Sequence, residues 1–126
     1  MIRCPATTRT TGRAIPSLRR ILAVLLVTCA VGHLAAAESV AVKYRGPVDL
    51  TPFECATYQG SAVVERICYD PRERYVVVKL TGTYYHYCEV PASLVAAWRE
   101  SPSLGQFYNR NIKGEFDCRV RRMPAY

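Results

Sequence analysis

Acidic residues are absent from the first 37 positions of this 126-residue chain, although ten occur from Glu38 onward. The same stretch carries five arginines, of which Arg19 and Arg20 are the last, and the apolar run 21–27 follows them directly. A basic, acid-free segment before a short apolar core is typical of a secretory signal peptide. Three alanines at 35–37 offer a small-residue cleavage site. We therefore predict that residues 1–37 are removed and that the protein is exported, either periplasmic or secreted.

Long apolar runs are scarce as well. The segment from Ile21 to Ala37 is shorter than the roughly 20 residues of a comfortable membrane span, and Gly32 and His33 weaken its far end. We therefore favour cleavage over a permanent anchor and expect no membrane span in the mature protein. Two variants stay open. Residues 26–29 distantly resemble a lipoprotein box with Cys29 as the lipidated residue, and the arginine pair at 19–20 distantly resembles a twin-arginine signal.

Cleavage of the signal peptide would also remove most of the net positive charge. The whole chain has a net charge of +7, but residues 38–126 hold 12 basic and 10 acidic residues, which leaves +2. Such a small net charge generates little long-range field to attract polyanions, so nucleic-acid binding is disfavoured. Arg121 and Arg122, with Arg119 just before them, form a basic tail at 121–126 that we expect to be solvated.

Residues 38–126 lack the patterns that most enzyme sites require. They contain one histidine, His86, and no C-x-x-C pair, no glycine-rich phosphate loop and no serine–histidine–acid spacing. We therefore predict no catalytic residue, no metal ligand and no cofactor, and hence no enzyme activity. A small thiol-based enzyme is the alternative, because His86 lies near Cys88. Alternate positions of a strand share a face, so strand geometry alone also accounts for this proximity.

Cysteine, in contrast, is well represented after the predicted cleavage, as Cys55, Cys68, Cys88 and Cys118. An even number of cysteines in a small exported domain is most simply explained by two disulfides. A chain of this length buries only a modest core, so covalent support matters. Each disulfide should stabilise the fold by about 2–4 kcal/mol, mainly by restricting the unfolded chain.

Strand and turn signals divide the rest of the chain. Residues 38–62, which contain several glycines and prolines, predict an irregular N-terminal extension with one short strand near 53–58. A β segment at 63–69 and a proline turn at 70–73 lead to strands 75–80 and 83–88, which are rich in β-branched and aromatic residues. Thr81-Gly82 links these two strands, and Gly82 can adopt the positive φ that a two-residue hairpin requires.

This hairpin has a defined register and two different faces. Leu80 pairs with Thr83, and the following pairs are Val78 with Tyr85 and Val76 with Tyr87. The predicted core face holds Val76, Val78, Leu80, Tyr85 and Tyr87. The other face holds Tyr75, Val77, Lys79, Tyr84, His86 and Cys88.

A helix should follow from about 91 to 101, because Pro91 suits a first helical turn and Pro102 halts it. Its apolar stripe would cover the core face and consists of Leu94, Val95, Ala97 and Trp98. We then expect a short turn at 106–109 and a further strand at 112–120 that carries Cys118. The predicted fold class is α+β, a small antiparallel β-meander of three to four strands packed against one α-helix and preceded by the signal peptide.

The hairpin register also restricts the disulfides. Cys68 and Cys88 would lie at similar heights on the two strands that flank 75–80, about 9–10 Å apart. Cα atoms of a disulfide are about 4.4–6.8 Å apart, so each cysteine should bond a partner from a flanking segment. We favour Cys55–Cys68 with Cys88–Cys118, and the exchange, Cys55–Cys88 with Cys68–Cys118, stays open.

Four ordered motifs occur between 63 and 114: Val64-x-x-Ile67-x-Tyr69-Asp70, Val76-x-Val78-x-Leu80, Gly82-x-x-Tyr85-x-Tyr87-x-x-Val90-Pro91 and Ser103-x-Gly105-x-Phe107-Tyr108-Asn109-x-x-Ile112. Together they resemble the KTSC domain, which is named for its occurrence at the C-terminus of some lysyl-tRNA synthetases and also occurs as small stand-alone proteins. The resemblance implies a compact antiparallel meander with a packed helix and carries over no catalytic residues. The predicted divisions are the signal peptide 1–37, the extension 38–62, a KTSC-like domain at 63–120 and the basic tail 121–126.

One candidate binding surface emerges from the second face of the hairpin. Tyr75, Tyr84 and His86, near Lys79, would form an aromatic and cationic surface for a flat ligand, and Asn109 lies after the glycine motif. We favour the alternative that these side chains pack beneath the extension, because Cys55 and Cys118 bring flanking segments onto this face. Asn109 is then a local cap.

The resulting functional prediction is an exported, non-catalytic module that binds a protein or an envelope component. The alternatives are the thiol-based enzyme and, by analogy with the synthetase-associated domain, a nucleic-acid-binding module. The residues identify neither the partner nor the oligomeric state.

Overall fold

The computed structural model describes residues 36–126, so Cys29 and nearly all of the predicted signal peptide lie outside it. The fold class is α+β, as predicted, and no described helix is long and apolar enough to cross a membrane. The elements are β1 (Ser39–Val42), β2 (Gly46–Asp49), β3 (Glu54–Thr57), β4 (Val64–Asp70), β5 (Tyr75–Leu80), β6 (Thr83–Tyr87), α1 (Ala92–Glu100) and α2 (Leu104–Asn111).

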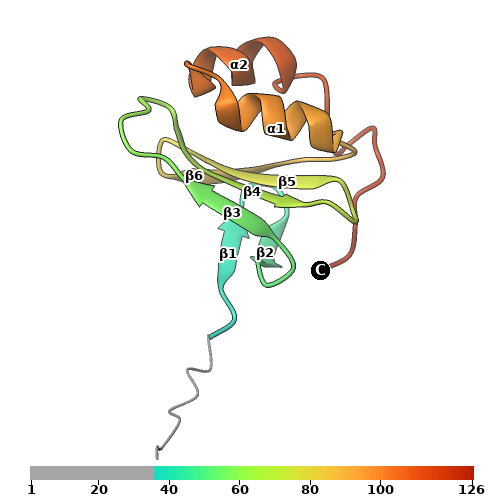
Figure 1. Cartoon of the computed structure of the whole chain (residues 1–126). Coiled ribbons are helices and arrows are strands. Elements are labelled where there is room, and N and C mark those ends of the chain that lie inside the picture. Colours follow the sequence, from blue (N-terminus) through green and yellow to red (C-terminus); the bar gives the residue numbers. More distant parts are fainter. Residues whose placement is uncertain (1–35) are drawn as a thin grey trace, which may run out of the picture. The chain divides into compact units, whose positions relative to one another are not determined.

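The six strands form one mixed sheet in the order β2-β1-β6-β5-β4-β3. Neighbouring strands are antiparallel except β1 and β6, which run parallel and pair at Val42 and Tyr84. The predicted antiparallel meander of three to four strands is therefore too small and lacks the parallel pair. Both helices lie on one side of the sheet, and β1 and β2 project from its other side (Figure 1).

The prediction of an irregular extension at 38–62 is wrong where β1 and β2 form a hairpin. Gly46-Pro47 suggested a break, but Gly46 takes a φ of +95° at the turn, and Pro47 lies on β2, an edge strand. An edge strand tolerates a proline because one side of its backbone has no strand to pair with. The short strand predicted near 53–58 is confirmed as β3.

The hairpin of β5 and β6 has the predicted register, with Leu80 opposite Thr83 at the turn and the same offset along both strands. Thr81 and Gly82 both have positive φ, of 46° and 82°. This backbone twist matches the twist of the strands, which is why a two-residue link suffices. The preceding turn is also as expected, because the Asp70 side chain accepts a hydrogen bond from the Arg72 backbone N–H at 3.0 Å.

Two helices cover the core face, where the sequence predicted one. The first, α1, agrees with the prediction except that Ala97 is exposed, whereas Val95 and Trp98 are buried. The predicted turn at 106–109 is wrong, because these residues lie within α2. The Ser103 hydroxyl accepts a hydrogen bond from the Gln106 backbone N–H and starts this second helix.

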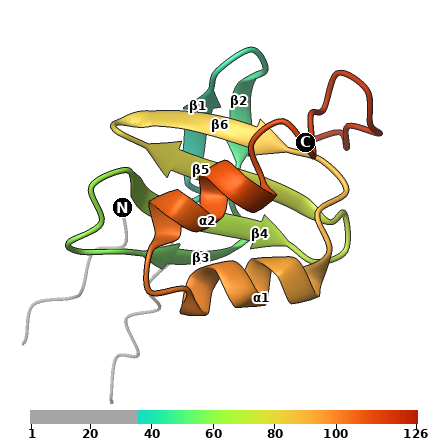
Figure 2. The same cartoon turned by 90° about the horizontal axis from the view of Figure 1, so that it is seen from above.

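The predicted strand at 112–120 does not form. Backbone hydrogen bonds here close local turns, from Glu115 N–H to the Ile112 carbonyl and from Val120 N–H to the Asp117 carbonyl, rather than a ladder. One long-range bond, from Cys88 N–H to the Phe116 carbonyl, holds the segment beside the end of β6. Figure 2 shows this C-terminal segment leaving α2 and passing the end of the sheet.

The sheet separates two buried clusters. The helix face is packed by α1 and α2 and contains Val64, Ile67, Tyr69, Val76, Val78, Leu80, Val90, Val95, Trp98, Leu104, Tyr108 and Ile112. The hairpin face lies on the other side, with β1 and β2, and contains Val42, Val48, Leu50, Phe53, Cys68, Tyr75, Val77, Cys88 and Cys118. The predicted core face of the β5–β6 hairpin thus belongs to the helix face. On the opposite face, Tyr75, Val77 and Cys88 are also buried, and Lys79, Tyr84 and His86 are partly buried.

The predicted solvated tail at 121–126 instead packs against the domain. The Tyr126 hydroxyl donates to Asp70 Oδ2 at 2.7 Å, and its ring lies 5.3 Å from that of Tyr75. Arg45 Nη2 donates to the Pro124 carbonyl at 2.8 Å. We call residues 119–126 the C-terminal strap, since the segment crosses the hairpin face and covers it.

Candidate functional site

Both disulfides lie on the hairpin face. Cys55 bonds Cys68 across β3 and β4 with Cα atoms 4.0 Å apart, and Cys88 bonds Cys118 with Cα atoms 4.9 Å apart. This is the pairing that the strand register favours. All four described cysteines therefore engage one another, and the Cys88–Cys118 bond anchors the segment after α2 at the end of β6.

The face predicted as an aromatic binding surface is largely covered. Tyr75 is completely buried, its hydroxyl lies 2.8 Å from His86 Nδ1, and its ring contacts Phe53 and Tyr126. Burial raises the pKa of Tyr75 to about 12. Tyr75 therefore cannot contact a ligand in this structure. The favoured alternative, that its side chain packs beneath flanking segments, is correct for this residue.

Two other residues of the predicted surface are occupied by internal contacts. The Tyr84 hydroxyl accepts a hydrogen bond from Arg66 at 3.3 Å, and the Lys79 ammonium lies 5.9 Å from the centre of the Tyr84 ring. Lys79 also forms an ion pair with Glu65 at 3.1 Å. These residues stabilise the sheet locally, since their polar groups already have partners.

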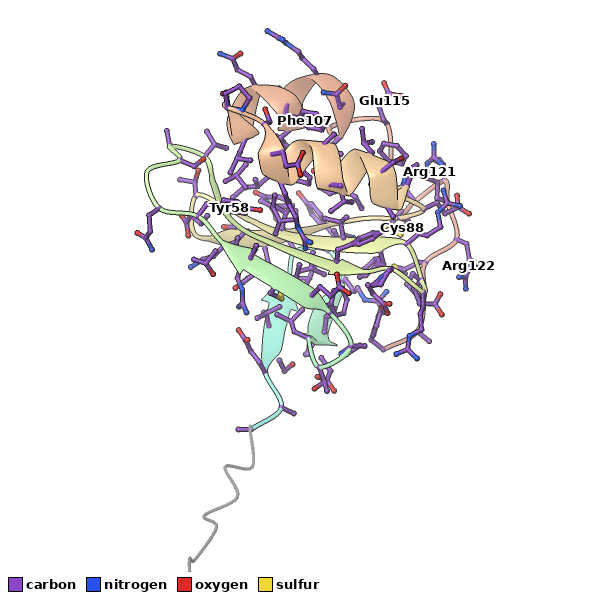
Figure 3. The ribbon with its side chains drawn as sticks, viewed as in Figure 1. Tyr58, Cys88, Phe107, Glu115, Arg121 and Arg122 are labelled. Carbon is purple, nitrogen blue, oxygen red and sulfur yellow. A yellow bond between two sulfur atoms is a disulfide. The ribbon has the colours of Figure 1, made fainter. Side chains whose placement is uncertain are left out.

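Asn109 lies far from the other predicted residues along the fold, on the exposed side of α2. It lines a groove of about 460 Å³ between the loop at 58–63 and the connection at 101–106. We call this the loop groove. No charged side chain lines it, and its polar side chains are those of serine, glutamine, asparagine and Tyr58. In Figure 3, Tyr58, which lines the loop groove, is labelled to the left of Cys88, which lies just after β6.

His86, the remaining predicted residue, lines a larger groove of about 630 Å³ along β6. Three segments build it: the turn between β1 and β2, residues 85–87 of β6, and the stretch after α2. We call it the tyrosine–lysine groove. Its lining consists of Lys43, Tyr44, Tyr85, His86, Tyr87, Lys113, Gly114, Asp117 and Arg119.

Lys43 holds a central place in this groove. Its ammonium lies 5.1 Å from the centre of the Tyr44 ring and 5.5 Å from that of Tyr85. A cation over an aromatic face is attracted by the ring quadrupole, so the two tyrosines position this charge. Interaction with the Tyr44 hydroxyl is the main cause that raises the pKa of Lys43, with Tyr85 adding to it.

The opposite charge in the groove is already neutralised. Asp117 forms an ion pair with Arg119, and its carboxylate also accepts a hydrogen bond from the Arg119 backbone N–H at 2.9 Å. The Arg119 side-chain hydrogen bond is the main reason that the pKa of Asp117 is lowered to about 2. Lys43 and Lys113 take part in no ion pair of the described residues.

Two lining residues are oriented by the domain interior. The Tyr87 hydroxyl lies 2.6 Å from that of Tyr108 on α2, and burial together with this bond raises the pKa of Tyr87. His86 is held by Tyr75, and burial together with nearby Arg45 lowers the pKa of His86. Both side chains are therefore fixed, whereas Tyr44 is 88% exposed at the tip of its turn.

Sequence reasoning missed most of this groove. It identified His86 but not Lys43, Tyr44 or Lys113, and it assigned Arg119 to a solvated tail. No sequence motif marks Lys43 and Tyr44, which are ordinary turn residues. They come close to Tyr85 only because β1 pairs with β6. Within residues 36–126, no cluster of three histidine, cysteine or acidic side chains could hold a metal ion.

Comparison with known proteins gives a family match. Residues 60–116 match the model of the KTSC domain, a span that runs from the loop before β4 to Phe116. A crystal structure of a KTSC domain protein from Yersinia pestis is similar to this chain, with 26% identity and a TM-score of 0.49. That match covers 52% of this chain and 92% of the other. No curated protein matches the chain.

Proposed function

We propose that the protein uses the segment that matches the KTSC domain, residues 60–116, as a non-catalytic binding module outside the cytoplasm. Export is supported by the acid-free, arginine-rich segment before Glu38 and by the two disulfides, since disulfides persist in oxidising compartments. The expected partner is a protein or another component of the cell envelope.

The tyrosine–lysine groove is the observation that carries this proposal. Its volume of about 630 Å³ lies within the range of about 300–1,000 Å³ that ligand pockets occupy. Tyrosines supply contact area at a low cost in side-chain entropy, and unpaired cations supply orientation. The loop groove is smaller and carries no charge, so it offers a partner less specificity.

Binding is favoured over thiol chemistry by the state of the cysteines. A thiol enzyme attacks through a thiolate, but Cys88, the cysteine nearest His86, is bonded to Cys118 and is fully buried. A count of free thiols in protein taken from its native compartment would test this point. Four oxidised cysteines support the binding module, and a free, reactive Cys88 would favour the enzyme instead.

Retention on cell envelopes tests the binding function directly. The protein, purified oxidised after export, would be mixed with membrane and cell-wall fractions and sedimented. The double variant Lys43→Ala, Tyr44→Ala should weaken retention by about tenfold, because it removes a cation and the most exposed aromatic ring of the groove. Arg110→Ala is the matched control, since Arg110 is an exposed cation on α2 outside the groove.

Equal retention of the wild-type and double-variant proteins would contradict the proposal. Circular dichroism and thermal unfolding should show that both variants keep the fold, because Lys43 and Tyr44 are exposed. Loss of retention in Arg110→Ala to the same extent would also contradict it, since binding would then follow total charge rather than this groove.

A further inference from the structure

We infer that the tyrosine–lysine groove binds a short acidic saccharide, a chain of sugar rings that carries carboxylates. This inference rests on the proposed function, because it names the ligand class of the same groove. Three properties of the groove lead to it: its size, the placement of its charge, and the way its tyrosines surround a lysine.

Size sets the scale of the ligand. A groove of about 630 Å³ accommodates a compound of a few rings, or a few units of a polymer that runs through it. A protein partner of standard size would need about 800 Å² of surface on each side, of which this groove could supply only a part. The groove is therefore suited to a small ligand or to a short stretch of a linear one.

Charge indicates that the ligand is an anion. Lys43, Lys113 and Arg119 against Asp117 give the groove a formal charge of +2, which equals the net charge of all residues from 38 to 126. Of the nine cations elsewhere in residues 38–126, four form ion pairs: Arg66–Glu38, Lys79–Glu65, Arg121–Glu89 and Arg122–Glu73. Three more, Arg45, Arg74 and Arg99, donate hydrogen bonds to backbone carbonyls. The groove thus carries a net positive charge, and its two lysines have no carboxylate partner among the described residues.

The tyrosines indicate a ligand rich in hydroxyl groups. Because the Lys43 ammonium lies over one face of both Tyr44 and Tyr85, a flat base that stacked on those faces would displace it. The phenol edges and hydroxyls, together with the ammonium, suit a partner that presents hydroxyls beside a carboxylate. Sugar acids combine these groups, whereas a nucleotide depends more on stacking.

The test uses the exported, oxidised protein with a galacturonic acid trimer as the probe. Its methyl ester keeps the rings and hydroxyls but removes the carboxylate charges, and is therefore the matched ligand control. We expect the acid to bind at least about tenfold more tightly than the ester in calorimetry at moderate salt, since each charge-assisted hydrogen bond is lost with the charge. Amide NMR shifts on titration should centre on residues 43, 44, 85, 86 and 113.

Protein variants complete the design. Lys43→Ala and Lys113→Ala should each weaken acid binding by about tenfold and leave ester binding nearly unchanged. Arg110→Ala should change neither. Equal affinity for acid and ester, or shifts centred on the loop groove, would overturn the inference. Citrate or a mononucleotide that bound as tightly as the trimer would overturn the saccharide assignment, because neither presents a chain of acidic sugar rings.

This experiment separates the inference from the function on which it rests. If the trimer fails to bind while envelope retention still depends on Lys43 and Tyr44, the groove remains a binding site and only the ligand class is wrong. If envelope retention is also unchanged in the Lys43→Ala, Tyr44→Ala variant, both the proposed function and the inference fail.

Discussion

On the helix face of the sheet, two helices bury a large apolar cluster around Trp98, which is fully buried and stacks on Phe107 and Tyr108. On the hairpin face, two strands of four residues and the C-terminal strap cover a smaller cluster that contains three of the four described cysteines. One face is therefore closed by helix packing, and the other by short segments, of which the strap directly follows the disulfide-bonded Cys118.

The difference shows how a small domain distributes its stability. Apolar burial contributes roughly 25 cal/mol per Å², so long helices with bulky side chains stabilise their face without cross-links. Short segments bury less surface while each ordered residue still loses backbone entropy. Disulfides offset part of this loss by restricting the unfolded chain. Cys55–Cys68 joins the neighbouring strands β3 and β4, and Cys88–Cys118 fastens the segment that leads into the strap.

The largest expected effect comes from removing the central side chain of the helix face. Trp98→Ala should lower the free energy of unfolding by about 3–5 kcal/mol, because it leaves a cavity beneath α2. It also removes the hydrogen bond from the indole N–H to the Leu104 carbonyl, which is 3.0 Å long. Urea unfolding would measure this loss. Ala97→Ser, at the exposed neighbouring position, is the control, and an equal effect of both variants would contradict packing as the main cause.

Loss of a disulfide should weaken the hairpin face nearly as much. The Cys88→Ala, Cys118→Ala variant should be destabilised by about 3–4 kcal/mol, because it releases a loop with a sequence separation of 30. The Cys55→Ala, Cys68→Ala variant, with a separation of 13, should lose about 3 kcal/mol. Thermal unfolding would rank them.

The two disulfide variants also differ in their expected effect on the groove. Cys118 anchors the segment that supplies Lys113 and Arg119, so only the Cys88–Cys118 pair should be needed for ligand binding. Unchanged binding after loss of this pair would show that the segment keeps its place without the cross-link.

Local chemistry made much of the helix face predictable. The β5–β6 hairpin follows from Gly82 and the alternation of side chains, and α1 follows from its apolar spacing and the two flanking prolines. Strand spacing across β4, β5 and β6 disfavoured a Cys68–Cys88 bond and favoured the observed disulfides, although it left their exchange open. The motifs that resemble the KTSC domain also lie in this part, and the family match covers it.

The hairpin face and the groove depend on contacts that no local pattern records. β1 joins β6 through one parallel position, although more than forty residues separate Val42 from Tyr84 in the chain. The strap returns to Asp70 across 56 residues. Because such long-range contacts bring Lys43, Tyr85 and Arg119 together, the site could not be assembled from spacing, even though His86 could be noticed.

The strap should contribute a smaller share of stability than the disulfides. Tyr126→Phe removes the hydroxyl that donates to Asp70, a carboxylate that is only 3% exposed. We expect a loss of about 1–2 kcal/mol in the free energy of unfolding, because one charge-assisted hydrogen bond disappears while Asp70 keeps its bond from Arg72. Tyr44→Phe, at an exposed tyrosine, should cost much less. No loss in Tyr126→Phe would mean that the strap is held by its backbone and arginines alone.

The smallest effect concerns the pH dependence of the hairpin face, where His86 is the single histidine of residues 38–126. Burial is the main cause that lowers the pKa of His86 from its ordinary value of 6.5, with Arg45 adding to it. As the pH falls through that value, the unfolded chain takes up a proton that the folded protein does not, so the free energy of unfolding should decrease. Protonation of Nδ1 would also remove the acceptor that faces the Tyr75 hydroxyl.

Urea unfolding between about pH 7.5 and 5.5 should therefore show a decline in the stability of the wild type, and His86→Gln should reduce this decline. Carboxylates titrate mainly below this window. Identical declines in both proteins would place the responsible group elsewhere, and a rise in stability toward acid would mean that His86 is better stabilised as a cation in the folded state than in water.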